Sequence, residues 1–292
     1  MTWLKWSGVA LAVLLVVGMG AVAYGSWHWE QGTKAILARL EAARVTASTS
    51  TAPTRYDARE LEGLPAPVQR YFRAVLKDGQ PIIAAATVQH TGTFNMSDTG
   101  EQWKPFTSKQ RVITQRPGFD WDARIMIFPG IPVHIHDSYI AGQGILRGAV
   151  LGLIPVVNMA DTPELARGEL MRFFAEAAWY PTALLPSQGV RWEALDESSA
   201  KATITDDKIA LTLTFSFSDE GVINTVHAKS RERVVDGKTV VAPWLGRFWS
   251  YALRDGMLVP TQGEVAWLLA QGQKPYWRGT TTSISFEFAN PS

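Results

Sequence analysis

The sequence contains no cysteine and carries almost no net charge. Its 292 residues include 28 Lys plus Arg and 27 Asp plus Glu, a formal charge of +1 at pH 7. Without cysteine, the chain cannot form disulfides, thiolate metal sites or a cysteine nucleophile. The balanced charge argues against a nucleic-acid partner, because phosphate binding needs a surplus of clustered Lys and Arg. With 46% hydrophobic and 19% charged residues, the chain is long enough to bury a substantial core.

Charge is also missing from one continuous stretch near the N-terminus. Residues 6–29 contain no Asp, Glu, Lys or Arg, and residues 9–23 are almost purely apolar. About 20 apolar residues cross a bilayer, and they do so as a helix because lipid offers the backbone no hydrogen bonds. Aromatic residues flank this stretch as interfacial anchors do: Trp3, Trp6, Tyr24, Trp27 and Trp29. We therefore expect a single-pass membrane protein whose bulk is extracytoplasmic.

A cleaved signal peptide is the alternative for the same stretch. Lys5 would supply its positive start, and an A-x-A site would place cleavage near Ala23, leaving a secreted or periplasmic protein. Orientation stays open at this stage. Lys34, Arg39 and Arg44 follow the stretch and would favour a cytoplasmic carboxyl side, yet long domains translocate largely regardless of charge.

The chain beyond the apolar stretch changes composition twice. Residues 30–44 have helix-forming composition, with Ile36, Leu37 and Leu40 on one stripe. Residues 46–54 are small and polar and include a proline, which is typical of a flexible linker. We predict three parts: a transmembrane anchor (or signal peptide) at 1–29, a helical stalk and flexible linker at 30–54, and a single β-rich extracytoplasmic domain at 55–292.

The rest of the chain is rich in strand patterns. Two amphipathic helices are predicted, over residues 68–77 and 162–180, and eleven strands are predicted between residues 87 and 288. Turn signals recur at the spacing of a meander. The predicted fold is mainly β (α+β), a large curved antiparallel sheet or half-open barrel covered by two amphipathic helices, plus the N-terminal transmembrane helix.

Several sequence blocks resemble an uncharacterised bacterial family of unknown function, over about residues 60–288. The blocks are LPAPVQRYF at 64–72, FDWDAR at 119–124, ARGELMR at 166–172, WYPTALLP at 179–186, PTQGEV at 260–265 and PYWRG at 275–279. The resemblance transfers no activity. More loosely, the strand-rich plan is similar to the periplasmic lipoprotein-carrier fold (LolA/LolB-like), whose half-open barrel binds acyl chains; this implies an architecture more than a function.

Motifs for catalysis are also missing. There is no G-x-S-x-G elbow, no P-loop and no complete dinucleotide loop. His134 and His136 share a strand face and could share a metal, but a third ligand is needed, and a polar strand face is the simpler interpretation. Asp120 and Asp122 likewise share a face, where they would meet Arg116 or Arg124. We predict no metal and no cofactor.

Aromatic residues are abundant, with 12 Trp, and most should fill the core. A subset could line a cavity between sheet and helices, together with Glu169, which would pair with Arg147, Arg191 or Arg247. The apolar segment 147–157 is either a buried strand or an apolar lip that touches lipid, and burial is the favoured interpretation. The candidate cavity residues are Trp121, Asp122, Glu169, Phe173, Trp179, Trp267 and Trp277.

These observations predict a membrane-anchored protein, attached to the membrane through its N-terminal helix, that binds a lipid, acyl chain or other hydrophobic ligand. One alternative is an envelope enzyme acting on lipid or glycan, with Asp120, Asp122 or Glu169 in acid–base roles. Another is a structural partner in an envelope complex.

Overall fold

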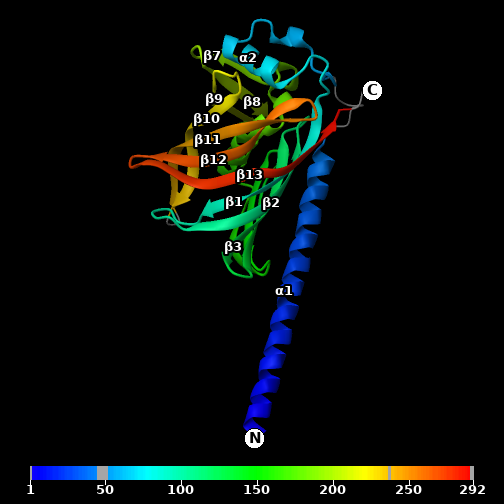
Figure 1. The fold of residues 1–292 in the computed structure, drawn as a ribbon, viewed down its shortest axis with the longest axis vertical. Coiled ribbons are helices and arrows are strands. Elements are labelled where there is room, and N and C mark those ends of the chain that lie inside the picture. Colours follow the sequence, from blue (N-terminus) through cyan, green and yellow to red (C-terminus); the bar gives the residue numbers. More distant parts are fainter. Residues whose placement is uncertain (1, 45–51, 236–237, 290–292) are drawn as a thin grey trace.

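A computed structural model describes residues 2–44, 52–235 and 238–289 of the chain (Figure 1). Residues 45–51, which hold most of the predicted linker, lie outside the described part.

The described residues form one antiparallel sheet of thirteen strands, ordered β6-β5-β4-β3-β2-β1-β13-β12-β11-β10-β9-β8-β7. The order is a meander in which β1 also pairs with the last strand, β13. The strands are β1 (Ile83–Asn95), β2 (Trp103–Ile113), β3 (Gly118–Phe128), β4 (Ile131–Ile140), β5 (Gln143–Val150), β6 (Ile154–Ala160), β7 (Arg191–Ala194), β8 (Ser199–Asp206), β9 (Ile209–Phe217), β10 (Ile223–Val235), β11 (Lys238–Arg254), β12 (Met257–Leu269) and β13 (Gly272–Phe288).

The sheet curls around the second amphipathic helix, α3 (Pro163–Ala175), without closing into a barrel. α3 contacts β3, β4 and β5 on one side and β9 and β10 on the other. The two halves of the sheet also meet directly, because the Tyr139 hydroxyl on β4 donates to Asp206 on β8 at 2.6 Å. The predicted mainly β fold, with an open curved sheet and helical cover, is therefore confirmed.

Short helices fill and cap the curled sheet. The turns that follow α3 are η2 (Glu176–Trp179), η3 (Pro181–Leu184) and η4 (Pro186–Gln188). α2 (Ala66–Val75) follows η1 (Ala58–Leu61) and covers the end of the molecule away from the N-terminus (Figure 1). Its buried stripe includes Tyr71 and Phe72, as the period of the sequence predicted.

The N-terminal helix α1 (Thr2–Ala43) has one bare part and one docked part. Side chains 6–24 are exposed, and α1 extends away from the sheet toward the N-terminus (Figure 1). The segment predicted as a stalk continues the helix and lies against the sheet, where Ile36 and Leu40 are buried with Ile113 and Ile140. Its apolar stripe needs cover, and the outer face of β2–β4 supplies it. At the top, Arg111 on β2 pairs with Glu41 at 2.7 Å.

The apolar segment 147–157 forms part of a hairpin that the strand prediction did not include. Gly152, with a φ of +71°, makes the turn between β5 and β6. Ala149 on β5 is buried, as favoured above, but Ile154, Pro155 and Val156 are exposed. Burial is thus wrong for the β6 half, because β6 is an edge strand with a free outer side.

Candidate functional site

The outer face of β3 and β4 holds a buried polar cluster under α1. Strand alternation puts Asp120 of β3 on the same face as His136 and Ser138 of β4. His136 Nδ1 donates to Asp120 Oδ1 at 3.0 Å, and the Ser138 hydroxyl donates to the same oxygen at 2.6 Å. The other ring nitrogen, Nε2, lies within hydrogen-bond distance of the Thr33 hydroxyl of α1, at 2.9 Å, and that hydroxyl also donates to the Trp29 carbonyl at 3.2 Å.

Trp29 of α1 covers this cluster. Its ring stacks on His136, with centroids 4.7 Å apart and planes 10° apart, and its Nε1 donates to Asp122 at 3.2 Å. Thr33, His136 and Asp120 line up as hydroxyl, imidazole and carboxylate, which is the order of groups in a Ser-His-Asp catalytic triad. However, Asp120 and His136 are only 1% and 2% exposed, which leaves no room for a substrate. The cluster therefore acts as a polar anchor that docks α1 on the sheet.

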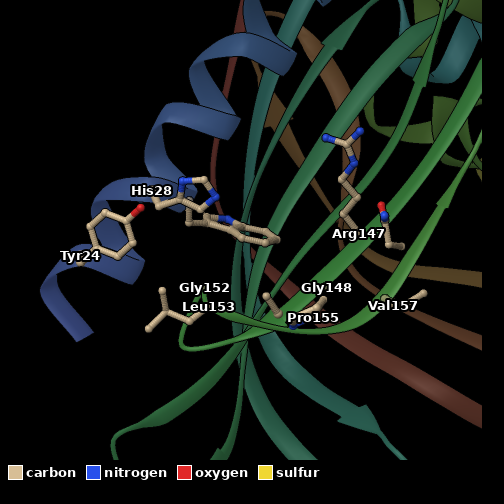
Figure 2. Close-up of a pocket in the computed structure, with 11 residues that line it drawn as sticks. Tyr24, His28, Arg147, Gly148, Gly152, Leu153, Pro155 and Val157 are labelled. Carbon is tan, nitrogen blue, oxygen red and sulfur yellow. The ribbon is translucent and has the colours of Figure 1, made fainter. Parts of the chain in front are cut away.

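Next to this anchor, toward the N-terminus of α1, the helix and the β5–β6 hairpin line an open pocket of about 410 Å³. Figure 2 shows Tyr24 and His28 on α1, Leu153 in the turn and Arg147 on β5. The lining residues are Tyr24, His28, Trp29, Arg147, Gly148, Ala149, Gly152, Leu153, Pro155, Val157 and Asn158.

The pocket has a polar end and an apolar end. Arg147 and Asn158 are cross-strand partners, so their side chains lie together at the end away from the turn. Ala149 pairs with Pro155 nearer the turn, where Leu153 adds further apolar surface. Arg147 forms no hydrogen bond or ion pair with the described residues. An unpaired guanidinium above an apolar slot is suited to an anionic amphiphile.

Two glycines bring the two walls of the pocket together. A Cβ atom on Gly25 would overlap the Leu151 carbonyl oxygen, and one on Gly152 would overlap the Gly25 carbonyl oxygen. The helix backbone therefore rests on the backbone of the turn. Side chains at either position would force the two elements apart and open the pocket.

The inner face of the same strands is filled by charged side chains from α3. Arg172 donates to Asp137 on β4 at 2.6 Å and to Glu176 at 2.8 Å, and its guanidinium lies 4.8 Å from the Trp121 ring centroid. Gln110 on β2 donates to Glu176 at 2.6 Å. The adjacent carboxylates outweigh the cost of burial and raise the pKa of Arg172.

Glu169 completes this inner cluster. It does not pair with Arg147, Arg191 or Arg247, the partners that were considered from the sequence. Its partner is Arg231 on β10, at 3.6 Å. Asp137 Oδ1 and Glu169 Oε2 have no N–H or O–H donor among the described residues. Burial, followed by the Asp137 charge, raises the pKa of Glu169 well above its usual value. A proton on Glu169 supplies the donor that Asp137 lacks.

His90 lies in the same interior, between the rings of Trp179 and Trp277, with centroids 4.8 and 5.5 Å away. Neither ring nitrogen has a hydrogen-bond partner among the described residues. Burial lowers the pKa of His90 to about 3, so the ring is neutral at pH 7.

The structure divides the predicted cavity residues between the two faces. Trp121, Phe173, Trp179 and Trp277 are buried in the main core, and Glu169 lies beside them, 5% exposed. Trp267 packs against this core and stacks on Tyr276 at 5.7 Å. Asp122 lies on the outer face, and none of the seven lines the pocket under α1.

Sequence reasoning missed the polar residues of this pocket. The segment that contains Arg147 was noted for its apolar character, and Tyr24 and Trp29 were assigned only to the membrane interface. Glycines at 142, 144, 148 and 152 signalled a hairpin in this region. In the described chain, no group of three or more His, Cys, Asp or Glu residues is placed to hold a metal.

A second pocket, of about 70 Å³, lies between α3 and strands β10 and β11. Its walls include Arg167, Met171 and Arg231. This volume suits a few water molecules rather than an organic ligand.

The fold is an open antiparallel sheet that wraps around α3 and contacts α1 along its outer face. The chain belongs to the family of unknown function DUF6920, whose model matches residues 62–286. The resemblance to such a family is therefore confirmed. The matched range contains the hairpin wall of the pocket, whereas α1 precedes it. No curated protein matches the chain.

Two solved structures are distantly similar. A LolA superfamily protein from Nitrosomonas europaea is 11% identical, with a TM-score of 0.36, over 76% of this chain and 92% of that chain. A β-barrel-like protein of the domain of unknown function DUF1849 from Brucella abortus is 10% identical, with a TM-score of 0.22, over 70% of this chain and 99% of that chain.

Proposed function

We propose that this protein is a membrane-tethered lipid-binding domain that holds an anionic amphiphile in the pocket between α1 and the β5–β6 hairpin. The observation that carries the proposal is the unpaired Arg147 at the polar end of an apolar slot of about 410 Å³. That volume is within the range of about 300–1,000 Å³ typical of small-molecule sites. The acyl part would lie along Leu153 and Pro155, with the anionic group at Arg147.

The position of the pocket on α1 supports a ligand drawn from a membrane. Among the described residues, α1 is the helix long and apolar enough to cross a bilayer, although a signal sequence meets the same criteria. The unbroken run of exposed residues 6–24 ends at Tyr24, which is also the first residue of the pocket wall. The proposed topology is single-pass, with the sheet outside the cytoplasm. Cleavage near Ala23 would instead leave the docked part of α1 in a periplasmic or secreted protein.

Native mass spectrometry of the full chain, released from membranes in a mild detergent, tests the proposal. We expect a bound lipid on the wild type and a loss of about tenfold or more in its affinity in Arg147→Gln, since a hydrogen bond to a charged group contributes about 1.5–3 kcal/mol.

Arg124→Gln is the matched control, because Arg124 is an exposed arginine on the same outer face, on β3, and does not line the pocket. It should keep the lipid. Equal retention by both variants, or a wild type without lipid, would overturn the proposal. An intact mass that begins after Ala23 would overturn the tether alone.

A further inference from the structure

Two turns at the end of the sheet nearer the N-terminus of α1 expose large apolar side chains. Phe128 and Ile131 flank the β3–β4 turn, and Ile154 and Val156 follow the β5–β6 turn. Phe128 is 64% exposed and Ile154 is 63% exposed. We call these four residues the apolar rim. A soluble surface rarely gathers such side chains at one edge, and a gathered set marks an interaction site.

The docking of α1 fixes the level of the rim along the helix. The β5–β6 turn rests on Gly25 through backbone contact. On β4, His136 lies opposite Thr33. The five residues from His136 back to Ile131 span about 16 Å of strand, which equals about 11 residues of helix and reaches the level of Val22.

This level coincides with the end of the apolar stretch of α1. If about 20 residues cross the bilayer, a span that ends at Tyr24 uses the whole apolar run. Tyr24 and Trp27, both exposed, then lie in the interfacial layer where aromatic rings are favoured. Both turns lie at this depth, because Leu151 in the β5–β6 turn contacts Gly25 and its N–H donates to the carbonyl of Pro132, next to the β3–β4 turn.

We propose that the apolar rim inserts into the interface of the bilayer that α1 crosses. The partner is a phospholipid surface, because the surface that covers the rim must also surround the exposed residues of α1. Lys104 lies 5.6 Å from the Phe128 ring centroid, so a cation accompanies the rim where lipid phosphates would lie. This inference rests on the tether in the proposed function. It also puts the pocket mouth at headgroup level, where a lipid can enter sideways.

Single-cysteine labelling tests the insertion directly, since the chain contains no cysteine of its own. The full-length variants Phe128→Cys and Ile154→Cys, each with an environment-sensitive fluorophore, are reconstituted in nanodiscs of phosphatidylcholine and phosphatidylglycerol. Quenching by a lipid with a shallow nitroxide is compared with quenching by iodide in water.

The matched control is Leu195→Cys. Leu195 is an exposed apolar residue near Glu197, whose carbonyl accepts from Arg70 of α2 at the opposite end of the molecule. Val16→Cys on the bare part of α1 reports whether the helix is in the bilayer.

We expect labels at 128 and 154 to be quenched several-fold more by the lipid nitroxide than the label at 195, and to be shielded from iodide. Lipid quenching at 16 but not at 128 and 154 would overturn the rim proposal and leave the tether intact. Absence of lipid quenching at 16 as well would overturn both. Introducing Arg147→Gln into the labelled chains should leave rim quenching unchanged, which separates insertion from ligand binding.

Discussion

The two faces of strands β3–β5 are covered by helices in opposite ways. On the inner face, α3 inserts Arg172 between two carboxylates and packs its apolar side into the main core. On the outer face, α1 is docked by one polar cluster and a small apolar cluster, and it touches the β5–β6 turn at Gly25 but leaves a pocket beside the strands of that hairpin. The inner face is filled, whereas the outer face retains space.

This difference bears on where an apolar ligand would bind. A curved sheet with helical cover suggests a cavity on its concave side, which is where the sequence placed most of its candidates. That side is instead occupied by α3, by aromatic rings and by buried charges. The described pocket of ligand size lies on the convex side, beside the helix that can cross a membrane.

The largest loss of folding stability is expected when Arg172 on the inner face is replaced. Removing one partner of a buried ion pair costs about 3–5 kcal/mol, because the remaining charge has no counterion. Arg172→Met should therefore destabilise the full chain by about this amount in urea unfolding followed by tryptophan fluorescence. Arg167→Met, at an exposed position on the same helix, should cost less than about 1 kcal/mol. Equal losses in both would mean that the inner face is not held by its charges.

His90 should make the inner face sensitive to acid. Its pKa is lowered from 6.5 to about 3 in the folded state, so the unfolded chain takes up the proton first. Stability from this residue is lost as pH falls below about 6.5, at about 1.4 kcal/mol per pH unit. Between pH 7 and pH 5, the free energy of unfolding of the wild type should fall by about 2 kcal/mol through this residue, and His90→Phe should not show this decrease. Parallel curves for the two proteins would contradict burial of a neutral ring.

Glu169 should make folding stability depend on pH in the direction opposite to His90. Its folded-state pKa is raised, so the folded chain keeps the proton longer, and stability falls as pH rises above the usual value of 4.5. Glu169→Gln keeps a donor for Asp137 without a titrating group. Relative to the wild type it should gain up to about 1.4 kcal/mol per pH unit within the window that begins at 4.5 and extends upward. A constant stability difference across that window would show that Glu169 holds no extra proton.

The smallest effect is expected on the outer face, at Gly25. Gly25→Leu inserts a side chain where the helix backbone meets the β5–β6 turn, so it should separate the two locally without unfolding the core. Amide hydrogen exchange at residues 149–154 should accelerate about tenfold, which corresponds to about 1.4 kcal/mol of local stability. Gly18→Leu is the control, because nothing lies near Gly18. Similar exchange in both variants would mean that this contact does not hold α1.

Most of the fold followed from local patterns, whereas the covering of each face did not. Alternation in β9 and the helical stripe of α2 predicted which residues share a face, and the structure agrees. Alternation cannot say what lies against that face. It placed His134 and His136 together but gave no sign that Trp29 would cover them. The partner of Glu169 was equally hidden, since Arg231 is distant in sequence and only curvature brings β10 to α3.

The β5–β6 hairpin was missed for a different physical reason. Gly148 and Gly152 interrupt the apolar segment, and a bulge at Val156, opposite Gly148 and Ala149, shifts the register of the two strands, so no regular period is visible. Eight of the eleven lining residues come from this irregular hairpin, and three come from a helix that the sequence assigned to the membrane. Neither set alone shows a binding site in the sequence.

Photo-crosslinking tests most directly whether a ligand binds under α1 rather than under α3. The full chain in its native membrane is incubated with a diazirine-bearing fatty acid, irradiated and digested, and the modified peptides are identified by mass spectrometry. Crosslinks are predicted in the pocket segments, residues 24–29 and 147–158. Crosslinks confined to Phe173, Trp179 or Trp277 would place the ligand on the inner face and contradict the account.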